Sequence, residues 1–126
     1  MTNKILRIIV ALPAILFVMM GLNWAINPAD AAAQLAMPLL DGLARGSQIG
    51  DLGALFLSMG LMILLALVTA RRSWFYAPAL MLSLAALFRL LAWILHDASL
   101  APQMVVVEVV VALLLLLSSR RLAEKE

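Results

Sequence analysis

The sequence contains no cysteine, few charged residues and a single histidine. Without cysteine the chain has no disulfide, no thiolate nucleophile, no thioether-linked haem and no zinc–thiolate site. Neither the spacing of a Ser-His-Asp triad nor a glycine-rich phosphate loop can be assembled from the remaining residues. We therefore predict no catalytic residue and no cofactor, and a protein that is not an enzyme.

Apolar residues dominate what is present. Hydrophobic residues make up 66% of the 126 positions and charged residues 13%, and the mean hydropathy is +1.10. Soluble domains are about 45–50% apolar and about 25% charged. The composition predicts an integral membrane protein with one domain, residues 1–126, and membrane lipids as partners. The basic pI does not indicate nucleic acid, because the basic residues form short clusters beside apolar spans.

Four apolar segments are predicted to cross the membrane, which takes about 20 helical residues. An isolated strand cannot satisfy its backbone in lipid, so each segment is expected to be a helix. The fold class predicted is all-α, an antiparallel four-transmembrane-helix bundle with a short helical outer loop at 27–48. The spans are residues 5–26, 49–70, 75–95 and 103–117.

Basic residues gather at one end of these spans, whereas the other two connections carry only Arg45. By the positive-inside rule both termini and the middle connection are cytoplasmic, and we expect a bacterial inner membrane. An alternative interpretation of the N-terminus is a secretory signal, but the apolar run continues to Ile26. The basic positions are Lys4, Arg7, Arg71, Arg72, Arg120, Arg121 and Lys125.

The outer loop at 27–48 carries a helix start. Asn27 is a good N-cap, Pro28 fits the first helical position and Asp30 lies in the first turn. We predict one or two short helices on the membrane surface or over the mouth of the bundle. A plain connector is the alternative.

Small residues recur along the second span. Such residues let helix backbones approach closely in lipid. Packing inside the bundle is the favoured interpretation, and homo-oligomerisation is the alternative. One series repeats every four residues at Gly42, Gly46, Gly50, Ala54 and Ser58, and a second face carries Gly53 and Gly60.

Two charged residues, Arg89 and Glu108, lie inside apolar spans. Counted from the ends of their helices, both lie about 8–10 Å below the outer boundary. An unpaired charge at mid-membrane costs about 2.5–3.5 kcal/mol on insertion scales. We therefore predict an intramembrane ion pair between Arg89 and Glu108.

Further polar residues lie at the same end of the spans, whereas the inner half is almost purely apolar, which disfavours a through-pore. They suggest a pocket that opens outward and takes a lipid, a quinone or another small amphiphile. His96 with nearby carboxylates is a weak metal signal, and we expect a hydrogen-bonded interfacial histidine instead. The candidate pocket residues beside the ion pair are Asn23, Asp51, Trp93 and His96.

Residues 51–117 together resemble a known family. The pattern comprises Asp51 opening a glycine-rich span, the run Phe88-Arg89-Leu90-Leu91-Ala92-Trp93, Asp97 and Pro102 in a short loop, and Glu108 in an aliphatic span. It resembles a bacterial family of small four-helix membrane proteins of unknown function, which looks related to the DoxX-like group. The resemblance implies a four-helix membrane bundle, but no activity.

Two functions remain open. The favoured one is a structural or accessory bundle, locked by the Arg89–Glu108 ion pair, that self-associates or joins a membrane complex. The alternative is a binding or carrier protein whose outward pocket holds a lipid, quinone or small amphiphile.

Overall fold

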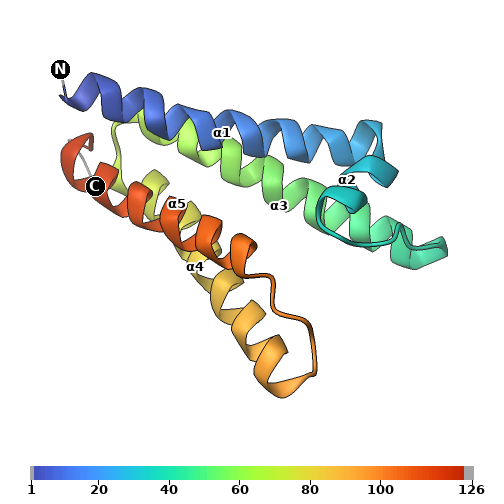
Figure 1. The fold of residues 1–126 in the computed structure, drawn as a ribbon. Helices are drawn as coiled ribbons and strands as arrows, with labels where there is room; N and C mark the ends of the chain where they lie inside the picture. The colour runs from blue at the N-terminus through green and yellow to red at the C-terminus, as the bar shows by residue number, and fades with distance from the viewer. Residues whose placement is uncertain (1, 124–126) are drawn as a thin grey trace.

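The structure, a computed structural model, describes residues 2–123, and within this range it consists of helices and short connections without a strand (Figure 1). The predicted all-α fold class is confirmed. Lys125, one of the basic residues that predict the topology, lies outside the described residues. The helices are α1 (Thr2–Ile26), α2 (Pro28–Gln34), α3 (Gly42–Thr69), α4 (Arg72–Leu95) and α5 (Pro102–Arg121).

Four of these helices are long and apolar enough to cross a membrane. Helices α1, α3, α4 and α5 contain 25, 28, 24 and 20 residues. At 1.5 Å per residue they are about 30–42 Å long, which spans a hydrocarbon core of about 30 Å. The chain is a multi-pass membrane protein.

Helix α3 begins earlier than the predicted span, at Gly42 rather than at residue 49. A salt bridge from Arg45 Nη2 to Asp41 Oδ1, 3.0 Å long, stabilises its first turn, and Arg45 Nε donates to the Leu40 carbonyl at 2.7 Å. Polar residues are accepted in this turn because the 28-residue helix is longer than the hydrocarbon layer. The outer loop therefore shortens to α2 and a brief connection.

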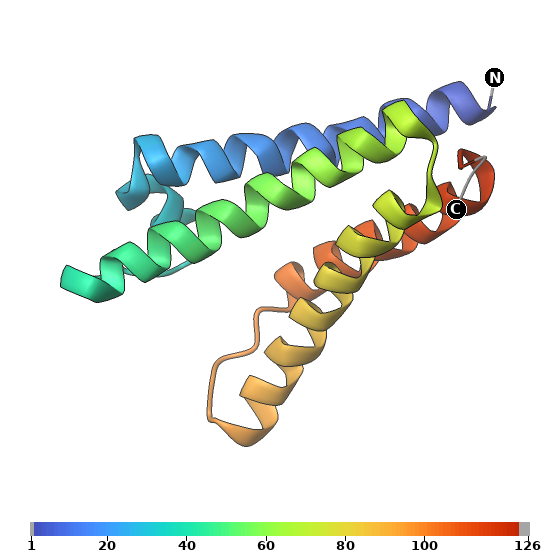
Figure 2. The same cartoon turned by 180° about the vertical axis from the view of Figure 1, so that it is seen from behind.

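The four long helices form two pairs arranged as a V (Figures 1 and 2). Helix α1 packs against α3, and α4 packs against α5. The pairs meet at the closed end, where α1 begins, α3 ends, α4 begins and α5 ends. They diverge toward the open end, where α2 lies beside α1.

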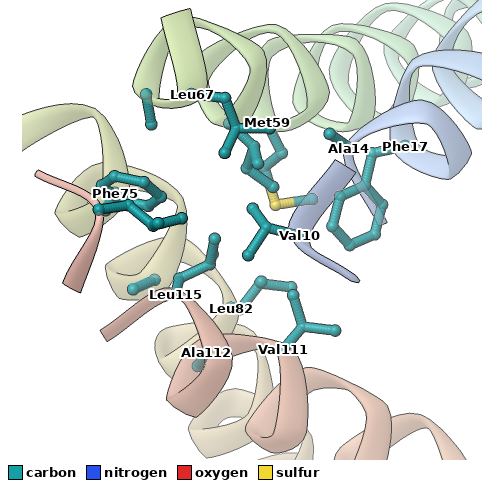
Figure 3. Close-up of a cluster of buried hydrophobic side chains, with 14 of the residues drawn as sticks. Val10, Ala14, Phe17, Met59, Leu67, Phe75, Leu82, Val111, Ala112 and Leu115 are labelled. Carbon is teal, nitrogen blue, oxygen red and sulfur yellow. The ribbon is translucent and has the colours of Figure 1, made fainter. Parts of the chain in front are cut away.

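The main core lies where all four long helices meet (Figure 3). Val10, Ile63, Phe75 and Leu115 come from the four different helices, and each is 0% exposed. At the closed end Arg7 Nη2 donates to the Leu67 carbonyl at 2.8 Å, which satisfies one of the free carbonyls in the last turn of α3. The core therefore joins the two arms of the V, whereas the Arg7 hydrogen bond lies within the α1–α3 arm.

Glycine makes the close contact between α1 and α3 possible. A Cβ added at Gly60 would lie 2.7 Å from the Ala14 carbonyl oxygen and from Val18 N. At Gly21 it would lie 2.6 Å from Leu57 N. These neighbours are backbone atoms, so a larger residue would force the helices apart.

The small residues of α3 divide between two faces. Gly53 and Gly60 are buried against α1. The small residues spaced four apart from Gly46 to Ser58 are exposed. Apart from the adjacent backbone of α3 itself, no described atom lies within 4 Å of a Cβ built at Gly46 or Gly50. Internal packing is therefore confirmed for the first pair and is wrong for the exposed series.

Helix α2 covers the open end of the α1–α3 pair. The predicted start is confirmed: Asn27 is the N-cap, its Oδ1 accepts from Asp30 N at 3.3 Å, and Pro28 opens the helix. Ala31 and Ala32 of α2 are buried against Trp24, and residues of α3 and of the connection complete this second cluster. The outer loop is thus a packed part of the fold.

Candidate functional site

Arg89 of α4 and Glu108 of α5 form an ion pair. Arg89 Nε lies 2.9 Å from Glu108 Oε1. Each residue lies about 9 Å from the open end of its helix, at 1.5 Å per residue. Their side chains are 37% and 12% exposed, so the carboxylate is much better covered than the guanidinium.

Helical periodicity places both charges in the seam between α4 and α5. On α4 the buried residues Ala79, Leu82 and Ala86 follow one another at three- or four-residue spacing, and Arg89 continues the series. On α5 Glu108 precedes the buried pair Val111 and Ala112 on the same face. The seam thus ends in an ion pair toward the open end.

The ion pair lies beyond the apolar packing of α4. Among the described residues of this helix, none after Ala86 is buried. The turns from Leu87 to Leu95 instead expose large apolar side chains, which face lipid in a membrane. In this part of the hairpin Arg89–Glu108 is the polar contact that joins the two helices.

An ion pair in a low-dielectric site has a large desolvation cost, which good geometry and hydrogen bonding must offset. Removing one partner is then more costly than the net value of the pair, because it leaves an uncompensated charge. Glu108 is the more covered partner. The arrangement suits a structural link and provides one neutralised polar contact in apolar surroundings.

Of the other four candidate pocket residues, Asn23 and Asp51 lie on α1 and α3, on the other arm of the V, whereas Trp93 and His96 lie on the same hairpin as the ion pair. Asn23 contacts α2, and Asp51 is exposed on α3, beside a separate depression near Gln48. Trp93 and His96 are exposed at the end of α4, on the hairpin that diverges from α1 and α3 (Figure 2). For Asn23 and Asp51 an equal depth in the membrane was insufficient, because the two arms of the V separate residues that share a level.

Gln48 is a buried polar residue that the sequence did not single out. It is 6% exposed, its Nε2 donates to the Pro38 carbonyl at 3.0 Å, and its Oε1 accepts from Leu40 N at 2.9 Å. Both ends of the amide are therefore used to hold the connection between α2 and α3. This role is structural.

A polar cluster around Asp30 was also missed. Asp30 Oδ2 accepts from Asn23 Nδ2 at 2.9 Å and from Gln34 Nε2 at 3.0 Å. The spacing of Asp30 and Gln34 on a helix was a usable signal. The contribution of Asn23 was not, because it depends on the turn that folds α2 back toward α1.

A metal centre does not assemble in the part of the chain that the structure describes. Within residues 2–123, no three His, Cys, Asp or Glu side chains lie close enough together to hold a metal ion. His96 and Asp97 lie at the exposed end of α4. The site geometry thus rests on the ion pair and on the Asp30 cluster.

Comparison with known proteins shows the family and no activity. No curated protein and no solved structure matches the chain. A family model described as a domain of unknown function, DUF4345, matches residues 5–119. The predicted relation to the DoxX-like group is not part of this match and stays a prediction. Because the match covers most of the sequence, including Arg89 and Glu108, the chain belongs to the DUF4345 family.

Proposed function

We propose that this protein is a structural or accessory membrane bundle that self-associates, alone or within a larger membrane complex. The observation that carries the proposal is the exposed series of small residues on α3. Gly50, Ala54 and Ser58 lie four residues apart on one face and face away from the rest of the chain. Small residues at this spacing are typical of contacts between membrane helices.

The physical reason why small residues favour association is that the solvent around these helices is lipid. Lipid is as apolar as leucine, so exposed leucines provide little force for association, whereas small residues permit close backbone contact. The α1–α3 contact in this same chain uses that principle, with Gly21 and Gly60 at the crossing. The series of Gly50, Ala54 and Ser58 would allow a second contact of this kind, with another molecule.

The ion pair supports a structural role. Arg89 and Glu108 neutralise each other within one hairpin, which leaves the hairpin without net charge at this depth. A carrier with one outward pocket has less support, because Asn23, Asp51 and Trp93 lie in separate places. We therefore favour a self-associating bundle in which the Arg89–Glu108 ion pair locks α4 to α5.

The test compares Ala54→Leu with the matched control Ala25→Leu, which makes the same change at an exposed position of α1. Native mass spectrometry from a mild detergent measures the oligomer distribution. The Ala54→Leu variant is expected to weaken association about tenfold or more, which corresponds to about 1.4 kcal/mol. The control is expected to match the wild type.

Two outcomes would contradict the proposal. Wild-type protein that is monomeric across the concentration range, with no co-purifying protein, would exclude association. Equal weakening by both leucine variants would show that the exposed face of α3 is not the contact surface.

A further inference from the structure

A groove at the open end of α1 is not used by the proposed self-association. It has a volume of about 430 Å³. Leu16, Met19 and Ile26 belong to its apolar wall, and Asn23, Asp30 and Gln34 form its polar end. The groove thus has an apolar part on the membrane-spanning helix and a polar part where that helix ends and α2 begins.

The polar end is rich in hydrogen-bond acceptors. The amide groups of Asn23 and Gln34 both donate to one oxygen, Asp30 Oδ2. Their own carbonyl oxygens and Asp30 Oδ1 then remain as acceptors around a negative charge. Within residues 2–123, no Lys or Arg forms a salt bridge with Asp30, whose carboxylate instead accepts hydrogen bonds from Asn23 and Gln34.

This chemistry suits a primary ammonium group. An ammonium carries three donors and one positive charge, and it has no acceptor. A headgroup with only negative charge, such as a free phosphate or a carboxylate, would meet the like charge of Asp30, although one N–H of each amide is not used by Asp30. A quaternary ammonium carries the charge but cannot donate hydrogen bonds. The polar end therefore distinguishes an ethanolamine-type headgroup from a choline-type one.

The apolar wall of the groove suits the hydrocarbon chain of an amphiphile that carries such a headgroup. From Leu16 to Ile26 it extends about 15 Å along α1, at 1.5 Å per residue. A ligand chain there would lie in the hydrocarbon layer, while its head would lie at the boundary near Asp30. An amphiphile in the groove would keep the orientation that it has in a bilayer.

We propose that this groove is a binding site for a membrane lipid with a primary ammonium headgroup, such as phosphatidylethanolamine. The ammonium pairs with Asp30, and the amide oxygens of Asn23 and Gln34 accept its remaining hydrogen bonds. One acyl chain lies along Leu16, Met19 and Ile26.

The test is a lipid titration followed by native mass spectrometry of the full chain in mild detergent. Phosphatidylethanolamine and phosphatidylcholine with identical acyl chains are the probes. The ethanolamine lipid is expected to bind about tenfold more tightly, because only its head donates hydrogen bonds to a charged acceptor. Asp30→Asn is expected to remove this preference, whereas the control Asp51→Asn, at an exposed carboxylate of α3, keeps it.

A second variant protects the test against misfolding of α2. Met19→Trp changes the apolar wall without altering the Asp30 hydrogen bonds, and Leu12→Trp makes a comparable change on α1 outside the groove. Met19→Trp is expected to weaken binding of the ethanolamine lipid severalfold, and Leu12→Trp to leave it unchanged. Equal affinity for the two lipids, or a preference that survives Asp30→Asn, would overturn the proposal. So would unchanged binding by Met19→Trp.

Discussion

At the scale of single residues, the two members of the ion pair are not equivalent. Arg89 is 37% exposed and Glu108 12% exposed. Arginine has a long stem that can carry its charged head toward the membrane boundary when a partner is lost. Glutamate has a shorter side chain, and Glu108 is better covered. Loss of Arg89 leaves the Glu108 carboxylate unpaired, and we expect this to cost more than the unpaired Arg89 that remains after loss of Glu108.

This asymmetry gives a stability prediction. Arg89→Ala is expected to lower the free energy of unfolding by about 2–3 kcal/mol, and Glu108→Ala by less. Thermal unfolding in detergent measures both variants. Asp51→Ala, at an exposed carboxylate of α3, is the control and should unfold like the wild type. A wild-type melting temperature for both alanine variants would refute a locking role.

Exchange of the two charges separates pairing from general damage. The double variant with Arg89→Glu and Glu108→Arg restores opposite charges across the same seam. We expect it to recover part of the stability that the single charge reversals lose, because unfavourable like-charge contacts disappear. The measurement is the melting temperature of the two single variants and of the double variant. Additive losses would show that no ion pair stabilises the fold.

At the scale of elements, α3 has two faces with small residues, and they have different roles. Gly53 and Gly60 face α1, whereas Gly50 and Ala54 face outward. Both series look alike in the sequence because each simply lacks large side chains. The partner helix decides which series is internal.

The internal face should be intolerant of one added methyl group. Gly60→Ala places a Cβ 2.7 Å from the Ala14 carbonyl oxygen, so we expect a loss of about 1–3 kcal/mol from overpacking. Gly46→Ala is the matched control, because a Cβ there meets no described atom within 4 Å apart from the adjacent backbone of α3. It should be neutral or slightly stabilising, since alanine favours helix over glycine. Thermal unfolding that ranks Gly46→Ala below Gly60→Ala would contradict the packing of α1 on α3.

At the scale of the whole molecule, the distribution of basic residues follows the axis that runs from the closed end to the open end of the V. Among the described residues, the closed end of the V carries basic residues on α1, α4 and α5, whereas the open end carries the Asp30 cluster and, besides Arg89 in its ion pair, Arg45 as its one Lys or Arg. We propose that the closed end faces the cytoplasm of a bacterial inner membrane, as the positive-inside rule predicts. Both termini would then be cytoplasmic.

The absence of cysteine makes this orientation directly testable. Single variants Ser73→Cys, at the start of α4, and Ser99→Cys, between α4 and α5, each introduce one thiol at an exposed position. A membrane-impermeant maleimide is expected to label Ser99→Cys in cells with a permeable outer layer. Ser73→Cys should react only after the inner membrane is opened. The reverse labelling pattern would invert the topology.

The number and the approximate bounds of the membrane helices could be predicted because hydrocarbon acts on each span separately. Each helix must satisfy its own backbone and present apolar side chains whatever its neighbours do. The ends were less predictable: α3 continues to Gly42 because the Asp41–Arg45 salt bridge stabilises a turn outside the apolar run. An apolar window does not detect such a turn.

The candidate site was predictable only where one short connection links the two partners. Arg89 and Glu108 lie at equal distances from the same α4–α5 connection, so their depth and helical faces could be counted. Asn23 and Asp51 were expected beside them at the same depth, but they lie on the other arm of the V. The crossing geometry of distant helices depends on side-chain packing, which depth alone does not encode.

The sequence by itself determined that this chain enters a membrane, crosses it with four helices and carries one pair of charges at a shared depth. These properties follow from the cost of exposing polar groups to lipid, which each segment meets independently. Only the tertiary structure decided that Gly60 and not Gly50 packs inside, and that Asn23 joins Asp30 rather than the ion pair. Those choices depend on which helix faces are brought together: α1 packs on the face of α3 that carries Gly60, and the turn after α1 brings α2 back to Asn23.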